Sequence, residues 1–313
     1  MEQSYSKTGV RARKGSPIKM TASDRIFNAF NISFWVLVLF VTLYPLYFIL
    51  ISSFSEPYAV LRGEVVFWPR DPSLIGYEAM FKFGHFWRAY LNSVVYTVSG
   101  TALSVAVTLM AGYALSNKFT GKPVVNFLII FQMFFSGGLI PTFLLMRDIG
   151  LYNNPLMMVF SGCVSVWNLM ITRTYMTSSI PRELYEAASI DGATHIKYFV
   201  SVVLPLSGTI TAVLCVYYGV ANWNNFMTAL IYIRDRRWYP VTLVLREILA
   251  KLTMDAATAN EMYDEAESVT EAIRVAEVVK YCAIVMSTGP AVILYVNMQK
   301  FFVKGVMIGS LKG

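Results

Sequence analysis

The sequence predicts an all-α, polytopic membrane protein with six transmembrane helices. Two observations support this: 56% of the 313 residues are hydrophobic and only 14% are charged, and the apolar residues lie in long, nearly charge-free windows. A spanning helix needs about 20 mostly apolar residues, and a central charge costs about 2.5 to 3.5 kcal/mol on insertion scales. The qualifying windows are Ile26 to Ser55, Ala89 to Asn117, Pro123 to Met146, Leu151 to Thr172, Tyr198 to Ile233, and Tyr281 to Gln299.

The fifth window, Tyr198 to Ile233, is too long for one straight span. We therefore expect part of it to lie at the interface or to continue the helix that precedes it. The polar segment 56–88 is expected to be an external, irregular loop with short helical pieces, because it carries several prolines and aromatic residues. The acidic, helix-prone segment 254–280 is either a solvated cap helix or a contact surface above the membrane.

A basic tail before the first window predicts that the N-terminus is cytoplasmic, because basic residues are retained on that side. An even number of spans then returns the C-terminus to the cytoplasm. The sequence is thus expected to comprise a cytoplasmic tail (1–25), a transmembrane domain (26–303) and a cytoplasmic C-terminal tail (304–313). The basic residues of the first tail are Lys7, Arg11, Arg13, Lys14, Lys19 and Arg25.

A polar stretch from Pro181 to Pro205 interrupts the apolar second half of the chain. Proline fits the first turn of a helix, and glycine supplies the left-handed residue that ends one. We therefore expect a helix from Pro181, a tight turn at Gly192 and a second helix that Pro205 kinks. On the first helix one face should carry small or apolar residues and end in a carboxylate: Leu184, Ala187, Ala188 and Asp191.

The same stretch resembles a known family. Glu186, Ala187, Ala188, Gly192, Leu204 and Pro205 match the "EAA" motif of permease subunits in binding-protein-dependent ABC importers, and Val202 stands where isoleucine is usual. The end of the chain, from Gln299 through Gly305 and Gly309 to Lys312, is similar to the C-terminal tail of maltose-type carbohydrate permeases.

The resemblance implies a multi-pass protein of a bacterial cytoplasmic membrane that imports a carbohydrate, in particular an oligosaccharide. It implies four kinds of partner: a second homologous permease, two ABC ATPases, an extracytoplasmic solute-binding protein and the saccharide. The loop 176–205 would then be a cytoplasmic coupling loop that contacts an ATPase, and the C-terminal tail would reach between the ATPases. The alternatives are an importer for another polar solute, such as a peptide or a polyol phosphate, and an ATP-independent carrier.

The residues themselves indicate no catalytic site, metal site or cofactor. Thr120-Gly121-Lys122-Pro123 lacks the upstream glycine of a phosphate-binding loop and has proline where Ser or Thr would hold magnesium, so it is expected to be a turn. ATP and magnesium should therefore bind to partner ATPases. The basic residues have no accompanying nucleic-acid motif. The cysteines and histidines lack metal-ligand spacing: Cys163, Cys215, Cys282, His85 and His195.

Two clusters of aromatic and amide residues lie inside predicted spans. Aromatic faces suit sugar rings and amides suit hydroxyl groups, and polar residues within spans usually face the bundle interior or a water-filled cavity. A solute path along these clusters is one hypothesis, an interfacial role for Trp223 is another, and the solute site could also lie on the partner permease. The candidate residues are Trp167, Asn168, Asn222, Trp223 and Asn225.

Overall fold

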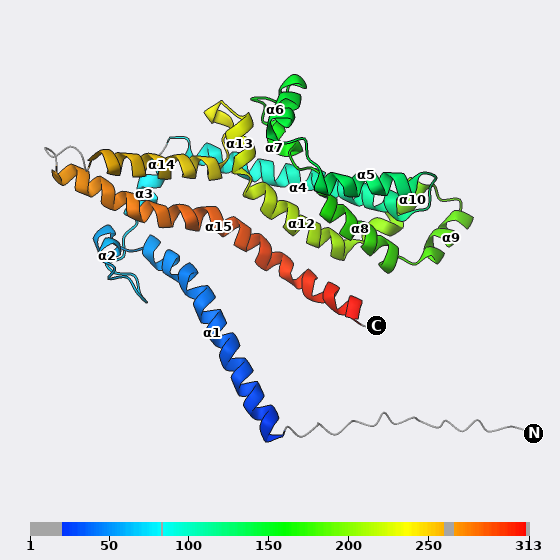
Figure 1. Cartoon of the computed structure of the whole chain (residues 1–313), viewed down its shortest axis with the longest axis horizontal. Coiled ribbons are helices and arrows are strands. Elements are labelled where there is room, and N and C mark those ends of the chain that lie inside the picture. The colour runs from blue at the N-terminus through cyan, green and yellow to red at the C-terminus, as the bar shows by residue number, and fades with distance from the viewer. Residues whose placement is uncertain (1–20, 83, 260–265, 311–313) are drawn as a thin grey trace, which may run out of the picture. The chain divides into compact units, whose positions relative to one another are not determined.

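The structure, a computed structural model, describes residues 21–82, 84–259 and 266–310 and contains no strand within these ranges (Figure 1). Its helices are α1 (Ala22–Ser53), α2 (Pro57–Leu61), α3 (Ile75–Phe81), α4 (Phe86–Ser116), α5 (Lys122–Phe134), α6 (Leu139–Asp148), α7 (Leu156–Phe160), α8 (Val166–Ser179), α9 (Arg182–Ile190), α10 (His195–Tyr198), π-helix η1 (Phe199–Val203), α11 (Leu204–Leu206), α12 (Gly208–Trp223), α13 (Phe226–Tyr232), 3-10 helix η2 (Arg236–Trp238), α14 (Val241–Ala259) and α15 (Ala266–Ser310).

The chain divides into two compact units, one ending at Phe48 and one beginning at Ile49. Most of α1 belongs to the first unit. Its start is fixed by Thr21, whose side-chain oxygen accepts from the Asp24 N–H at 3.3 Å while the Asp24 carboxylate accepts from the Thr21 N–H at 2.9 Å. This reciprocal cap satisfies N–H groups that the first helical turn leaves open. The following apolar residues are almost all exposed, as expected for a lipid-facing span.

The second unit is built around α4, which packs along both α8 and α12. Small residues allow this close approach. A Cβ at Gly112 would lie 2.6 Å from the Thr172 Cγ2 of α8, and a Cβ at Gly100 would lie 3.0 Å from the Asn222 Nδ2 of α12. Tyr218 of α12 shares a 2.7 Å hydrogen bond with Thr108 of α4. The three helices therefore form one tightly joined group.

Three of the predicted windows correspond to helices long and apolar enough to span: Ala22–Ser53, Phe86–Ser116 and Arg274–Gln299. The fifth window is divided, as expected, because His195–Leu206 bends by 79° from Gly208–Trp223. Counting each bent helix pair as one span gives up to five candidate spans in the described part of the chain.

The third and fourth windows are not the continuous helices that we expected. In the third, Lys122–Phe134 and Leu139–Asp148 differ in direction by 116°, because α5 ends at Phe134, Phe135 is extended, and Gly138 leads into α6 with a φ of +81° that favours glycine. The fourth breaks between α7 and α8, where Gly162 has a φ of +68°. Hydropathy does not register these breaks, since glycine and serine hardly lower the mean of an apolar window.

The backbone of the segments between the predicted spans is as expected, whereas the external position of 56–88 stays a prediction. The segment 56–88 contains two short helices, α2 and α3, separated by irregular backbone. Gly121 has a φ of +85° and precedes Lys122 and Pro123 at the start of α5, so this sequence is the turn that we expected. Beyond α13, helices α14 and α15 pack against each other. Helix α14 and the start of α15 lie at the opposite end of the second unit from α9, and α15 then runs along α12 (Figure 1).

Candidate functional site

The stretch from Pro181 to Pro205 forms a helical elbow, as the sequence predicts. Pro181 caps α9, which ends at Ile190. Gly192 then adopts a φ of +75°, and the Ala193 N–H donates to the Ala188 carbonyl at 2.9 Å, which is the closure expected of a left-handed helix end. Thr194 starts α10 by accepting from the Lys197 N–H at 3.3 Å.

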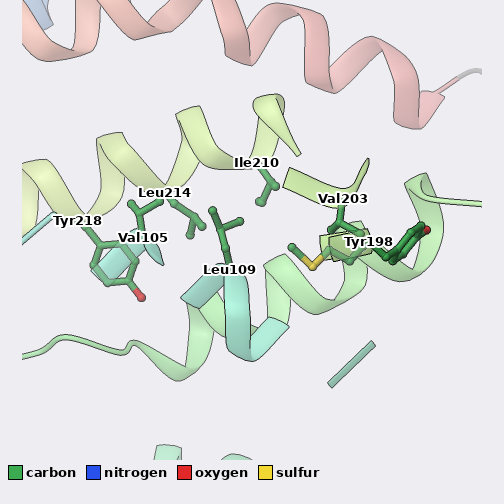
Figure 2. Packing of buried hydrophobic residues seen from close by; sticks show 8 residues of the cluster. Val105, Leu109, Tyr198, Val203, Ile210, Leu214 and Tyr218 are labelled. Carbon is green, nitrogen blue, oxygen red and sulfur yellow. The ribbon is translucent and has the colours of Figure 1, made fainter. Parts of the chain in front are cut away.

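The inner face of α9 differs from the face that we expected. Of the four residues placed on one face, only Ala188 packs against the buried cluster, and the others are exposed. The reason is Tyr185, whose ring takes the inward position and packs edge-on against Tyr198 at 5.3 Å. Figure 2 shows Tyr198 among the residues of this cluster from α4, η1 and α12: Val105, Leu109, Val203, Ile210, Leu214 and Tyr218.

His195 links the elbow to α4. Its ring stacks on Tyr185 with centroids 5.4 Å apart. Its two nitrogens lie 3.5 Å from the Tyr113 hydroxyl of α4 and 3.3 Å from the Tyr185 hydroxyl. Tyr113 also packs on Phe199 at 5.1 Å. Sequence reasoning missed these aromatic contacts. The available signal was the tyrosine that follows Leu184 inside the motif, but the Tyr113 hydroxyl that meets His195 lies 82 positions earlier than this histidine.

An open pocket of about 490 Å³ separates part of the elbow from the ends of α4 and α8. Aromatic and polar side chains line it, among them Tyr113, Lys118, Thr177, Arg182, Tyr185 and His195. The α9 part of the elbow is therefore held through Tyr185, Ala188 and His195 and is not embedded on all sides, whereas the buried Tyr198 and Val203 anchor its second half.

The outer face of α9 and α10 is exposed and partly apolar. Ile190 is 87% exposed and Ile196 is 77% exposed, while Glu186, Ala187 and Asp191 are exposed beside them. The Arg182 to Glu186 pair, at 3.6 Å, is solvated and contributes little to stability. Large apolar side chains on an otherwise polar projection are typical of a surface that a partner covers.

The elbow continues into α12 through a kink. Pro205 has no N–H to donate within a helix, and the turn before it, η1, is π-helical. The path bends by 79° next to Ser207, whose buried hydroxyl donates to the Val203 carbonyl at 2.7 Å. Leu204 lies on the exposed side of this turn. The elbow is thus joined to α12 through a short, hydrogen-bonded bend.

The residues proposed for a solute path have different environments. Trp167 is 61% exposed. Trp223 is buried, packs against Tyr90 and donates to the Ser287 carbonyl at 2.6 Å. The remaining three are engaged within the fold: Asn168 is buried, Asn222 donates to Thr101 Oγ1 at 3.3 Å, and Asn225 caps α13. Only Trp167 of this set presents a largely free face.

The C-terminal residues lie at the end of α15. Gln299 is exposed, and Gly305 and Gly309 fall within the bounds of this helix, which continues to Ser310. Lys312 lies outside the described residues, as does most of the basic N-terminal tail. The expected contact of the C-terminal tail with an ATPase stays a prediction.

These observations define a multi-helix membrane component with an exposed elbow joined to its central helices. The sequence profile of one family matches residues 79–307, and its description is "binding-protein-dependent transport system inner membrane component". The chain belongs to this family. It is a permease subunit of an ABC importer, a non-enzymatic component of the inner membrane.

Similar proteins agree over nearly the whole chain. Protein LplC of Bacillus subtilis (strain 168) is 32% identical over 94% of this chain and 97% of its own length. The polygalacturonan/rhamnogalacturonan transport system permease protein YtcP of the same organism is 31% identical over 93% and 99%. A crystal structure of a bacterial ABC transporter involved in the import of the acidic polysaccharide alginate matches with a TM-score of 0.80 and 30% identity, covering 91% of this chain and 99% of the other.

The two alanines of the motif are expected to respond differently to bulk. Ala187 is exposed, whereas Ala188 packs against the buried cluster. Ala187→Trp should reduce transport-coupled ATP hydrolysis by roughly tenfold with little loss of stability. Ala188→Trp should also destabilise the protein by about 1 to 3 kcal/mol through overpacking. Thermal unfolding in detergent, measured beside ATPase activity in the assembled complex, distinguishes the two; equal destabilisation would contradict this assignment of faces.

Proposed function

We propose that this chain moves a carbohydrate, specifically an oligosaccharide, across the cytoplasmic membrane, driven by ATP hydrolysis in separate subunits. The observation that carries the proposal is the exposed elbow joined through His195 and Tyr113 to the central helix. The names of YtcP and of the alginate importer support a saccharide as the solute. The second of these names describes its polysaccharide as acidic.

We propose further that the chain has six spans and that both termini, with the coupling loop 176–205, are cytoplasmic. Two contacts of α4 support placing its two ends on opposite sides of the membrane. Asn92 binds the loop after α13, and Tyr113 binds the elbow. Their separation of 21 positions corresponds to about 30 Å of helix, which is about the thickness of the hydrocarbon core. On this assignment, 1–25 and 304–313 are the cytoplasmic tails of the transmembrane domain 26–303.

The mechanism is a rigid-body movement that begins at the elbow. Closure of an ATPase pair would press on the exposed face of α9, and the bend at Ser207 would pass the displacement to α12. The hydroxyl of Tyr218 then carries it further, because it shares a hydrogen bond with Thr108 and accepts from the Ser165 N–H at 3.1 Å. Helices α4, α8 and α12 would therefore tilt together and open the path to one side of the membrane.

The proposal requires other polypeptides. ATP and magnesium would bind to two partner ATPases, which contact Glu186, Asp191 and Gly192 at the elbow. The C-terminal residues Gln299, Gly305, Gly309 and Lys312 would reach the same subunits. A second homologous permease would complete the path, and a solute-binding protein would deliver the saccharide from outside. The free face of Trp167 is the strongest candidate on this chain for a solute contact.

The assembly can be tested directly. The tagged chain, purified in mild detergent from its native host, is expected to bring down a second permease and an ATP-hydrolysing protein. Replacement of both Ile190 and Ile196 by lysine should weaken that association by at least about tenfold, because it charges the apolar part of the elbow face. Lysine at Leu61 and Leu74, which are exposed in the segment 56–88 outside the predicted spans, is the control. Recovery of the native chain without any ATPase would contradict the proposed function.

A further inference from the structure

The segment 234–239, Arg-Asp-Arg-Arg-Trp-Tyr, joins α13 to α14 and carries three exposed arginines. Its first residues are fixed by one side chain. Asn153 Oδ1 accepts from the backbone N–H groups of Arg234 at 3.0 Å and of Asp235 at 2.9 Å. Asn153 itself has a φ of +54° and donates its N–H to the Tyr232 carbonyl at 2.8 Å. This asparagine adopts a conformation that few side chains tolerate, and it thereby anchors the start of the loop.

The other half of the loop is bound to the first turns of α4. Asn92 Nδ2 donates to the carbonyls of Arg237 at 2.8 Å and Tyr239 at 3.1 Å. The Tyr96 hydroxyl donates to the Trp238 carbonyl at 3.0 Å. Side chains of other elements therefore hold the backbone of this loop at both of its ends. The side chains of the loop project from a backbone that is fixed in place.

The charges on this loop and on the adjacent turn of α4 are mostly positive. Arg88 lies one turn before Asn92 on α4 and acts electrostatically on Asp235. Among the described residues, no carboxylate lies within ion-pair distance of Arg88 or Arg234. The charged groups of the loop and of the residues that interact with it are Arg88, Arg234, Arg236 and Arg237 against Asp235 and Glu247, four positive and two negative charges.

One of the two carboxylates is committed to an arginine. The Arg237 guanidinium donates to both oxygens of Asp235, at distances from 2.6 to 3.1 Å. These hydrogen bonds hold the pKa of the Asp235 carboxyl below its ordinary value, so it remains ionised and positions Arg237. Glu247 lies 3.9 Å from Arg236. Arg88 and Arg234 are left to bind an external anion.

We propose that Arg88 and Arg234, together with Trp238 of the same loop, bind the carboxylates of a uronate-containing oligosaccharide at the outer mouth of the path. This inference rests on the proposed function and specifies its substrate class. Guanidinium groups bind carboxylates in a planar, two-point geometry, and Trp238, which is 39% exposed, offers an apolar face for a sugar ring. The combination selects an acidic saccharide over a neutral one.

The test uses the complete transporter in proteoliposomes, with its partner permease, ATPases and solute-binding protein. The two cargoes are short oligogalacturonates and their methyl esters, which share a backbone and differ in charge. The double variant Arg88→Gln/Arg234→Gln should lower uptake of the free acids by about five- to tenfold and change uptake of the esters by less than about twofold. Arg62→Gln, an exposed arginine on the segment after α2, is the control and should alter neither.

A second measurement addresses the rival partner, an acidic surface of the solute-binding protein. The Kd between the loaded binding protein and the transporter should be the same for the wild type and the double variant. A weakened Kd, with equal losses for both cargoes, would assign the arginines to protein docking and overturn the proposal. Unchanged uptake of the acids would overturn it as well. Wild-type transporter that takes up esters and acids equally contradicts only the arginine site, whereas one that takes up no saccharide contradicts the proposed function.

Discussion

Replacement of Gly192 by valine is expected to reduce solute uptake by more than about tenfold while the protein still inserts in the membrane. Gly192 has a φ of +75°, and a Cβ there would meet no atom within 4 Å. The cost is therefore backbone strain, on the order of 1 to 3 kcal/mol for a β-branched residue in the left-handed region. The turn would relax by another path and displace the exposed face of α9 from its position beside α10.

Two control variants distinguish the effect of backbone strain from the effect of its position in the chain. Gly192→Asn should retain most of the uptake, because asparagine tolerates the left-handed conformation better than other residues with a Cβ. Gly121→Val carries a similar strain, since Gly121 has a φ of +85° and open space around it, but it lies in the turn before α5. Uptake should be measured against the amount of inserted protein. If Gly192→Val and Gly121→Val lose the same small fraction of uptake, the elbow does not transmit movement.

The elbow could be predicted from the sequence because its determinants are local. Pro181, Gly192 and Pro205 each restrict the backbone within one turn of themselves, and the structure has the helix, the left-handed turn and the kink at these positions. The inner face of α9 could not be predicted in the same way. It depends on Tyr185 meeting His195 and Tyr198, which is a matter of tertiary packing.

The spans show the limits of hydropathy. Long, charge-free windows identified α1, α4 and the apolar part of α15, because composition alone decides whether such a helix is stable in lipid. The same measure missed the bend between α5 and α6 and the break before α8. Those breaks contain residues whose backbone leaves the helical region, the extended Phe135 and the positive-φ Gly138 and Gly162, and a residue inside an apolar window does not reveal its φ and ψ.

The aromatic and amide clusters were ambiguous for a related reason. A polar residue within a span can face a cavity or bind a neighbouring helix. Asn222 meets Thr101, and Trp223 meets Ser287. These partners are 121 and 64 positions away in the sequence, so the pattern of one span cannot indicate which role applies. Trp167 is exposed, and the solute-path hypothesis requires an aromatic face that a solute can reach.

Replacement of Gly112 by alanine is expected to be the most destabilising single-methyl change in the joined helices. A Cβ at Gly112 would lie 2.6 Å from Thr172 Cγ2, and Thr172 is fully buried. Helices α4 and α8 must separate to admit it, which should cost about 1 to 3 kcal/mol. Thr172→Ser removes the opposing methyl and keeps the hydroxyl, which donates to the Asn168 carbonyl at 2.7 Å.

The double variant Gly112→Ala/Thr172→Ser should therefore recover part of the loss. Thr172→Ser alone should cost about 1 kcal/mol for the missing methyl, and the two changes together should cost at least about 1 kcal/mol less than their sum. Gly289→Ala is the matched control, because Gly289 is helical and a Cβ there would meet no atom within 4 Å; alanine at this position should be neutral or stabilising by up to about 1 kcal/mol. Thermal unfolding of these variants and the wild type in one detergent measures the coupling. Strict additivity of the two changes in the free energy of unfolding would mean that α4 and α8 do not approach each other at Gly112 and Thr172. The proposed joint movement of α4, α8 and α12 would then lack its closest contact.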